Sequence, residues 1–116
     1  MPMETEDSIL KTIRMLLLSG DEPTPFDVNI LVGINSAIFI LTQLGVGPPG
    51  GFSVKDENEK WSDFVDLDSN FEAVKTYIHL KTKLVFDPPS SAALIDSINA
   101  IIDEIEWRLR EQADMK

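Results

Sequence analysis

A chain of 116 residues, of which 43% are hydrophobic and 26% charged, has the balance of one globular domain, and this excludes wholesale disorder. Its formal net charge of −10 disfavours sequence-independent binding of nucleic acid, because such binding needs Lys and Arg side chains to neutralise phosphates. The chain has no cysteine, so it has no disulfide or thiolate metal site, which fits a reducing cytoplasm.

The N-terminus is acidic and lacks the basic and then apolar pattern of a secretory signal. The most apolar run, 28–44, is interrupted by polar residues and is too polar to span a membrane. We therefore expect a soluble protein without a membrane partner.

The first predicted helix spans 6–18, where apolar residues recur at helical spacing and form one face. Asp7 or Ser8 is expected to cap its start, and Gly20 to adopt the left-handed conformation that ends it. The linker 21–25 contains two prolines and is expected to be extended and stiff.

The second predicted helix spans 27–44, with Asp27 as its cap and Gly45 as its stop. Apolar residues cover most of its circumference, which is typical of a helix that is buried on nearly all sides. So short a chain has little protein to cover it, so we expect one face to contact another copy. The candidates for contacts between subunits in this region are Phe26, Ile38 and Phe39.

The loop 45–51 matches the dinucleotide fingerprint G-x-G-x-x-G, which we interpret as coincidence. That motif needs a strand before it and a helix after it, so that the pyrophosphate meets a helix N-terminus. Here a predicted helix comes first, and Pro48 and Pro49 prevent the helix that should follow. No cofactor is expected.

The segment 52–68 has aromatic residues that are too widely spaced for a long helix. It has room for a short strand at 51–54 and a short turn of helix at 61–65. Trp61 and Phe64, together with Phe52, are candidates for anchors that hold this loop on the helical body or reach another subunit, because their rings bury a large area. A long ordered loop in a small domain is often functional.

The third predicted helix spans 70–86 and begins with an S-x-x-E capping box made by Ser69 and Glu72. Two neighbouring apolar lines run along it. Its remaining face carries Lys75, Lys81 and Lys83. These lysines either meet an acidic partner or form the solvated side of an amphipathic helix, and we favour the second interpretation.

The fourth predicted helix spans 91–112 and follows a corner made by Asp87, Pro88 and Pro89. Proline fixes φ and lacks an amide donor, so two prolines in a row end the third helix and stiffen the turn. The apolar stripe expected to pack the fourth helix consists of Leu94, Ile98, Ile101, Ile105 and Leu109, widened by Ile95 and Ile102. The fold class is therefore all-α: one domain, 1–116, with four helices and a long irregular loop between the second and the third.

Candidate sites for chemistry are few. His79 is the only histidine and has no evident catalytic partner in the sequence. The segment 66–70 imitates the opening of a calcium loop, but the Gly and Glu that such a loop requires further on are absent, so we interpret it as helix capping. Weak binding of a divalent ion by Asp63, Asp66 and Asp68 is the less favoured alternative. No catalytic, metal or cofactor residue is predicted, and the protein is not expected to be an enzyme.

Several segments form an ordered pattern that covers nearly the whole chain. They are Ile34-Asn35-Ser36, Leu41 to Gly47, Gly51-Phe52-Ser53 with Trp61, Val74 to Ile78 with Leu80-Lys81, Leu84 to Pro89, and Glu106 to Leu109. This series resembles a family of small tailed-phage and prophage proteins, the head–tail connector or adaptor proteins. The order of the segments is more specific than any one of them.

The resemblance implies an all-helical protomer that assembles as a ring, typically a dodecamer, beneath the portal protein of the capsid. Tail proteins or head-completion proteins would dock on the far side of the ring. DNA would pass through its centre without specific binding. The protein would be made in the cytoplasm of the bacterial host and reside in the neck of the virion.

The acidic surplus suits the wall of such a channel, because an acidic wall repels phosphate. The candidate channel-facing residues are Asp56, Glu57 and Glu59 of the loop and Asp96, Asp103 and Glu106 of the fourth helix. The same charge supports an alternative function, a small acidic regulatory or DNA-mimicking module that occupies the basic site of a protein partner.

Overall fold

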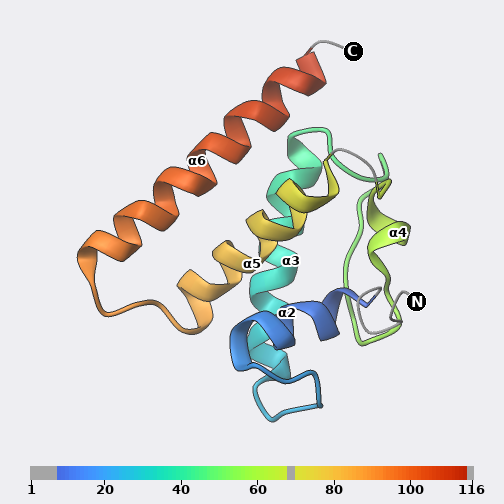
Figure 1. Ribbon diagram of the computed structural model, residues 1–116. Helices are drawn as coiled ribbons and strands as arrows, with labels where there is room; N and C mark the ends of the chain where they lie inside the picture. Colours follow the sequence, from blue (N-terminus) through green and yellow to red (C-terminus); the bar gives the residue numbers. More distant parts are fainter. Residues whose placement is uncertain (1–7, 68–69, 115–116) are drawn as a thin grey trace.

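The computed structural model describes residues 8–67 and 70–114. Within these ranges it contains five helices and no sheet, so the predicted all-α class is confirmed. The prediction of four helices undercounts by one, because the turn expected at 61–65 forms a short helix of its own, α4 (Trp61–Phe64). Figure 1 shows α3 and α5 at the centre, with α6 on one side of this pair and α4 on the other.

Helix α2 spans Ile9–Leu18 and is capped by Ser8, whose hydroxyl accepts the backbone N–H of Lys11 at 3.2 Å. The other expected cap, Asp7, lies outside the described residues. The helix ends one residue earlier than Gly20 would require: Ser19 takes the left-handed conformation, with φ of 62°, and its N–H bonds to the carbonyl of Met15. The expectation for Gly20 was therefore wrong.

Helix α3 spans Asp27–Gln43, close to the predicted bounds. Asp27 is not its cap, contrary to the prediction, because Phe26 occupies the cap position and the Asp27 carboxylate binds Arg14. At the other end, Gly45 has a φ of 93°, and the N–H of Val46 bonds back to the carbonyl of Leu41 at 2.9 Å. A glycine is suited to this positive φ, which turns the chain out of the helix.

Helices α3 and α5 (Phe71–Phe86) cross closely and hold the centre of the core. The crossing is possible because Gly33 has no side chain: a Cβ there would lie 2.8 Å from Cγ2 of Thr82. The residues that are fully buried around this crossing include Ile30, Ile34, Ile38, Val74 and Ile78.

The segment between α3 and α4 contains no strand, so the strand predicted at 51–54 is wrong. Asn35 explains the difference, because its side chain donates to the carbonyl of Val54 at 2.9 Å and accepts the N–H of Val54 at 2.7 Å. Both backbone groups that a strand would use at Val54 are thereby bound to α3 instead. The only β-type pairing among the described residues is an isolated bridge between Ser8 and Lys60.

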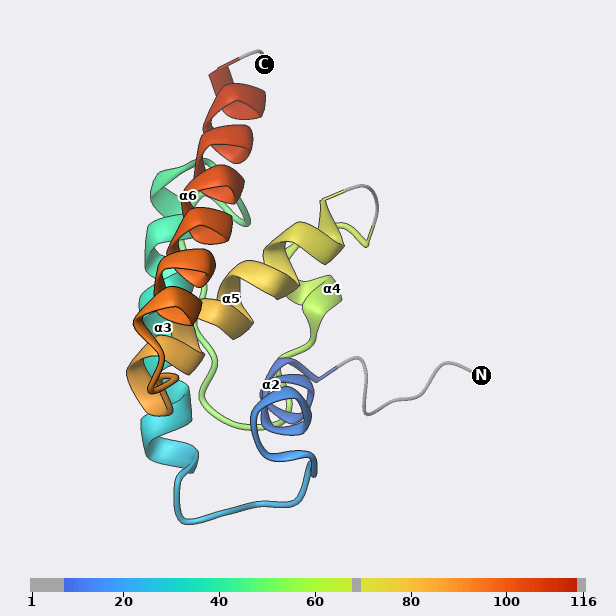
Figure 2. The ribbon, with the colours of Figure 1, turned by 60° about the vertical axis from the view of Figure 1, so that its left-hand side comes forward.

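Helices α5 and α6 (Ala92–Asp114) run antiparallel, as a hairpin (Figures 1 and 2). The side chain of Asn70 donates to Gln112 at 2.7 Å near the open end, and the Tyr77 hydroxyl donates to Glu106 at 2.7 Å further along. Ser91 caps α6, since its hydroxyl accepts the N–H of Leu94 at 3.3 Å. Ser69 of the predicted capping box of α5 lies outside the described residues.

The apolar stripe predicted for α6 is partly wrong. Ile102, Ile105 and Leu109 are buried, but Leu94 is 56% exposed and Ile101 46% exposed. Helix α6 packs mainly against α5. A single neighbouring helix covers too narrow a face to bury both of the adjacent apolar lines of α6. Leu94 and Ile101 therefore remain on an open flank of the helix.

Candidate assembly surface

The outward side of α3 carries large apolar residues that no part of the chain described by the structure covers. Val28 is 71% exposed, Val32 56% and Phe39 63%, although the opposite side of the same helix is fully buried. With Ser36 and Gln43 they follow one stripe of the helix, which we call the α3 outer face. Val28 and Phe39 are eleven residues apart, so the part of the stripe that carries the large apolar residues is about 16 Å long.

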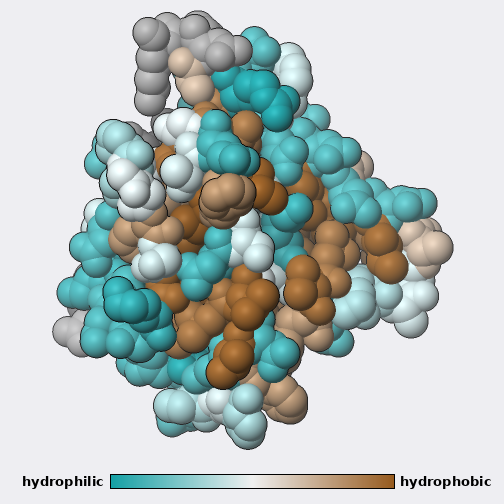
Figure 3. Space-filling model, turned by 180° about the vertical axis from the view of Figure 1, so that it is seen from behind, coloured by the Kyte–Doolittle hydropathy of each residue, from teal (hydrophilic) through white to brown (hydrophobic). Residues whose placement is uncertain are grey.

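A hollow of about 550 Å³ lies at one end of the α3 outer face, where α2, α3 and α5 meet. Its lining consists of Leu18, Phe26, Asn29, Val32, Val85, Phe86 and Asp87. Phe26 and Phe86 meet edge to face, with their ring centres 5.8 Å apart, yet Phe26 is still 52% exposed. Figure 3 shows apolar residues gathered in the middle of the rear face, over α3, with polar residues around them.

The α3 outer face is uncharged. The only charged residue of α3 is Asp27, and both of its carboxylate oxygens accept hydrogen bonds from the guanidinium of Arg14, at 2.9 and 2.6 Å. Arg14 is itself 1% exposed and also donates to Glu57 and to the carbonyl of Asp21. The hydrogen bond from Arg14 holds the pKa of Asp27 below its usual value. An apolar stripe without charge in a chain of net charge −10 is suited to contact with another protein.

The structure separates the residues that the sequence nominated for subunit contacts. Phe26 and Phe39 lie exposed beside or on the α3 outer face. Ile38 is fully buried in the core, so it has no surface to offer another copy. It is the neighbour of Phe39 along the helix, about 100° around the axis, and this rotation alone moves it from the outer side to the inner.

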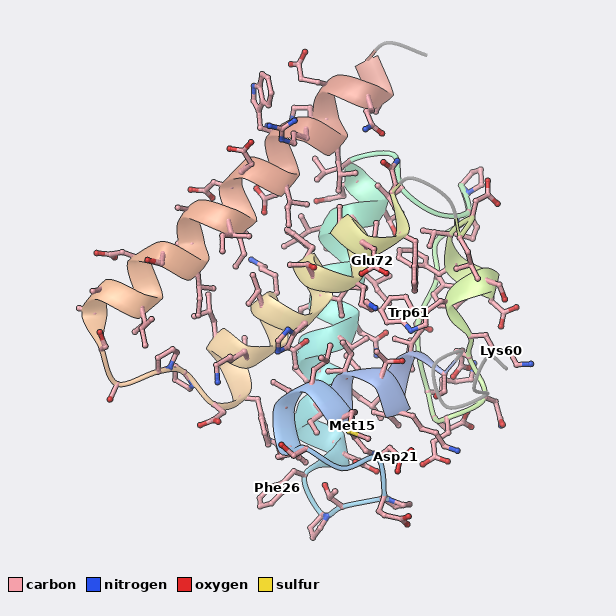
Figure 4. The ribbon with its side chains drawn as sticks, viewed as in Figure 1. Met15, Asp21, Phe26, Lys60, Trp61 and Glu72 are labelled. Atoms are coloured by element: carbon pink, nitrogen blue, oxygen red, sulfur yellow. The ribbon has the colours of Figure 1, made fainter. Side chains whose placement is uncertain are left out.

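The aromatic residues of the loop lie against the helical body. Trp61 is fully buried, donates from Nε1 to the Thr12 hydroxyl at 3.0 Å and meets Phe71 edge to face (Figure 4). Phe64 is 3% exposed and stacks on Phe52 with ring centres 5.1 Å apart. Because these rings fill the space between the loop and α2 or α5, we propose that they anchor the loop rather than reach a neighbour.

Two of the three loop acids nominated for a channel wall are engaged inside the protomer. Glu57 pairs with the buried Arg14. Glu59 accepts the backbone N–H groups of Lys55 and Asp56, each at 3.1 Å, and although burial opposes the charge, these hydrogen bonds keep the pKa of Glu59 below its usual value. Asp56 is exposed and accepts the N–H of Asn58 at 2.8 Å. These acids shape the loop, and of the three only Asp56 is well exposed.

The acids of α6 divide in a similar way. Glu106 accepts the hydroxyl of Tyr77, whose pKa is raised by burial and by this carboxylate. Asp96 and Asp103 are both exposed on α6, and the charge of Asp103 contributes to the raised pKa of Tyr77 on α5. They are therefore free to meet a molecule outside the protomer.

The corner between α5 and α6 has the residues nominated for it. α5 ends at Phe86, and Asp87 follows with φ of −153° and ψ of 67°, a conformation that is neither helical nor extended. Its carboxylate lies 3.8 Å from the ammonium group of Lys83 in the last turn of α5. Pro88 and Pro89 then separate this end from the first residue of α6.

No arrangement for metal or cofactor chemistry emerges in the described part of the chain. Among residues 8–67 and 70–114, no group of three acidic or histidine side chains is placed to hold a metal ion. Asp63 accepts the N–H of Lys60 at 3.0 Å, and Asp68 lies outside the described residues. Helix α3 precedes the glycine loop 45–51, and no helix begins directly after this loop, as the sequence predicted. No described helix is both long enough and apolar enough to cross a membrane.

Sequence reasoning missed Arg14 and the hollow beside α3. A signal for Arg14 was present, because it is a basic residue directly after the apolar Ile13, on a helix whose inner face is otherwise aliphatic. The hollow could not be found in this way, since Leu18, Phe26 and Val85 are far apart in sequence and only the crossing of α3 and α5 brings them together.

Comparison with known proteins gives one match. A family model described as "Phage connector protein" matches residues 9–116, nearly the whole chain and all five helices. No curated protein and no solved structure matches significantly. A match over this length shows the family, in agreement with the ordered segments found in the sequence, and the chain therefore belongs to the phage connector proteins.

Proposed function

We propose that this protein is a structural component of the virion neck, where copies assemble through the α3 outer face into a ring between the portal and the tail. Membership of the connector family supports a place among the head and tail proteins of a phage. The observation that carries the ring is the exposed, uncharged and apolar α3 outer face with its adjoining hollow. The genome passes through the centre of the ring, and the protein performs no chemistry on it.

The distribution of charge supports this face as the contact between copies. Two chains of net charge −10 repel one another, and the repulsion is strongest where acidic surfaces approach. The α3 outer face has no charge, so a second copy approaches there with least repulsion. Burying Val28, Val32 and Phe39 then supplies hydrophobic stabilisation of about 1.5–3 kcal/mol for each side chain that becomes fully covered.

A ring needs two different surfaces on each copy, and the structure has a second one. Contacts between unlike surfaces close into a ring when the rotation between copies allows it. Leu94 and Ile101 form an exposed apolar flank on α6. Ala113, on one side of the buried residues of α6, lies near Gly45 at the end of α3. At about 100° per residue, Leu94 and Ile101 lie on the other side of those buried residues. We therefore assign the α3 outer face of one copy to the α6 flank of the next.

The test is assembly on the portal protein of the same phage, observed by negative-stain electron microscopy. The wild-type protein should add a ring of density to the portal, and Phe39→Glu should remain a folded monomer and add none. Met15→Glu is a matched control, because Met15 is 44% exposed on α2 and its replacement changes the charge equally. A portal that gains no density from the wild-type protein overturns the neck function, whereas a ring formed by Phe39→Glu overturns only the assigned surface.

A further inference from the structure

The side of α6 that points away from the protein carries an exposed tryptophan. Trp107 is 56% exposed, whereas Trp61, the other tryptophan, is fully buried. Relative to the buried Ile102, Trp107 lies about 140° around the helix at 100° per residue. Asp96, Ala100 and Asp103 precede it by eleven, seven and four residues on the same stripe, and all three are exposed. We call these four residues the α6 outer stripe.

The acids of the α6 outer stripe are unpaired. Within the described part of the chain, no basic side chain pairs with Asp96 or Asp103, although Asp27, Glu57 and Glu104 all have such partners. Arg108 is held by Glu104 at 2.7 Å and is not available to them. Arg110 is exposed three residues after Trp107, about one turn further along. The stripe therefore has two free acids before the indole and a basic residue after it.

A second copy of this chain supplies little complementary charge: among the described basic side chains, only Lys60, Lys81 and Arg110 have no ion pair with a carboxylate. The lysines of α5 are already occupied: Lys75 lies 3.4 Å from Glu72 and over the Phe71 ring, and Lys83 lies 3.8 Å from Asp87. Lys81 lies over the ring of Tyr77. Copies also share the net charge of −10, so like charges meet when this stripe approaches another copy.

A wall for passing DNA does not explain the stripe either. The two acids suit such a wall, but an indole exposed to water gains nothing from a duplex whose bases are stacked and whose backbone the acids repel. Tryptophan is, in contrast, among the residues that most often dominate protein–protein interfaces, because its ring offers a large area and a hydrogen-bond donor.

We propose that the α6 outer stripe docks a basic segment of a different protein in the neck. Lys or Arg side chains of that segment would pair with Asp96 and Asp103, and an Arg or apolar side chain would lie on the indole of Trp107, where a guanidinium can stack. An acidic residue one turn further would meet Arg110. This surface is separate from the α3 outer face, so the inference does not depend on assembly of the ring.

The two tryptophans allow this to be measured without labels. Acrylamide quenches exposed tryptophan and leaves the buried Trp61 largely unquenched, and Trp107→Phe identifies the signal of Trp107. The probes are the purified portal protein and the purified tail-side neck protein of the same phage, each added to the full chain. With one of them, quenching of Trp107 should fall several-fold, and the affinity should fall as salt rises.

Substitutions then locate the contact. Trp107→Ala should weaken binding of that partner about tenfold or more, as expected for a central aromatic contact. Asp103→Lys should weaken it as well, whereas Glu22→Lys, an equal change of charge on the exposed linker between α2 and α3, should not. Circular dichroism of each variant shows that the exposed substitutions leave the fold intact.

Three results overturn the inference. One is a Trp107 that stays as quenchable with both neck proteins as it is in the free chain. Another is a Trp107 that becomes shielded when the chain alone is concentrated, which assigns the stripe to a second copy. The third is an equal loss of binding for Asp103→Lys and Glu22→Lys, which would show that binding depends on the overall charge of the protein and not on a defined site at the α6 outer stripe.

Discussion

The crossing of α3 and α5 contains a buried hydroxyl group that destabilises the protein. Thr82 is fully buried against Gly33, and its Oγ1 has no hydrogen-bond partner among the described residues. Its Cγ2 methyl group fills the space beside Gly33. Its hydroxyl, the other branch on Cβ, makes no hydrogen bond within the described part of the chain that would offset the cost of burying it. Replacing Thr82 by Val keeps the methyl group and exchanges the hydroxyl for a second one. We therefore predict that Thr82→Val stabilises the fold.

The size of the effect follows from the cost of burying an unpaired polar group, about 1–3 kcal/mol. Val and Thr have similar helix propensities, so the helix itself changes little. A methyl group is slightly larger than a hydroxyl, which offsets part of the gain in a packed core. The net expectation is about 1–2 kcal/mol in the free energy of unfolding, or roughly 4 °C in Tm for each kcal/mol at this chain length.

Urea unfolding followed by circular dichroism measures this change, with Thr82→Ser and Gly33→Ala as controls. Thr82→Ser keeps the hydroxyl and removes the methyl group, so it should lower the free energy of unfolding by about 1 kcal/mol. Gly33→Ala places a methyl group into the crossing and should cost on the order of 1–3 kcal/mol. A Thr82→Val protein less stable than wild type refutes the reasoning, because the hydroxyl must then be paired in the folded chain.

Substitutions at two further positions test Trp61 as the anchor of the loop and the ion pair between Arg14 and Asp27. Trp61→Ala should cost on the order of 3 kcal/mol, measured by urea unfolding, because it empties a fully buried site; Trp61→Phe should cost less, since it loses chiefly the hydrogen bond to Thr12. A Trp61→Ala chain as stable as wild type contradicts the role of anchor. Asp27→Asn tests how the Arg14–Asp27 ion pair links stability to pH. The pKa of Asp27 is lowered in the folded protein, so its charge stabilises the fold above the pKa of about 4 that it has in the unfolded chain. This stabilisation is lost as pH falls through the lower pKa of the folded protein. Scanning Tm from about pH 7 to 3 should show a smaller acid loss for Asp27→Asn than for wild type, and parallel curves for the two proteins would show that Arg14 does not depend on this charge.

Helix positions were predictable because their signal is local. The spacing of apolar residues is a local signal, and so are the residues that start or end helices, such as Ser8, Gly45, Pro88 and Pro89. All four long helices therefore appear near their expected bounds. The strand expected at 51–54 failed for a non-local reason, since Asn35 of α3 takes both backbone groups of Val54. A sequence pattern does not reveal such a competitor nineteen residues away.

Which side of a helix is covered was predictable only in part. On α2, which packs against both α3 and α5, the apolar residues Ile9, Leu10 and Ile13 are buried as expected, whereas Leu16 of the same apolar face is 46% exposed. For α6 two apolar lines lie side by side, and the sequence has no means of choosing between Ile101 and Ile102, which are adjacent in the chain but 46% and 3% exposed. The choice depends on where α5 lies against α6, and this is a property of the fold.

The proposed function depends on surfaces that the fold of a single protomer leaves open. Helix α3 is apolar on nearly all sides, yet α2 and α5 cover only its inner part, and no described residue covers the uncharged α3 outer face. A protein that worked alone would gain solubility from polar residues at Val28, Val32 and Phe39, at no cost to its core. The proposed ring accounts for the apolar residues there, because a second copy would cover them. Phe39→Glu, which should preserve the folded monomer and abolish the ring, separates these two demands on one helix.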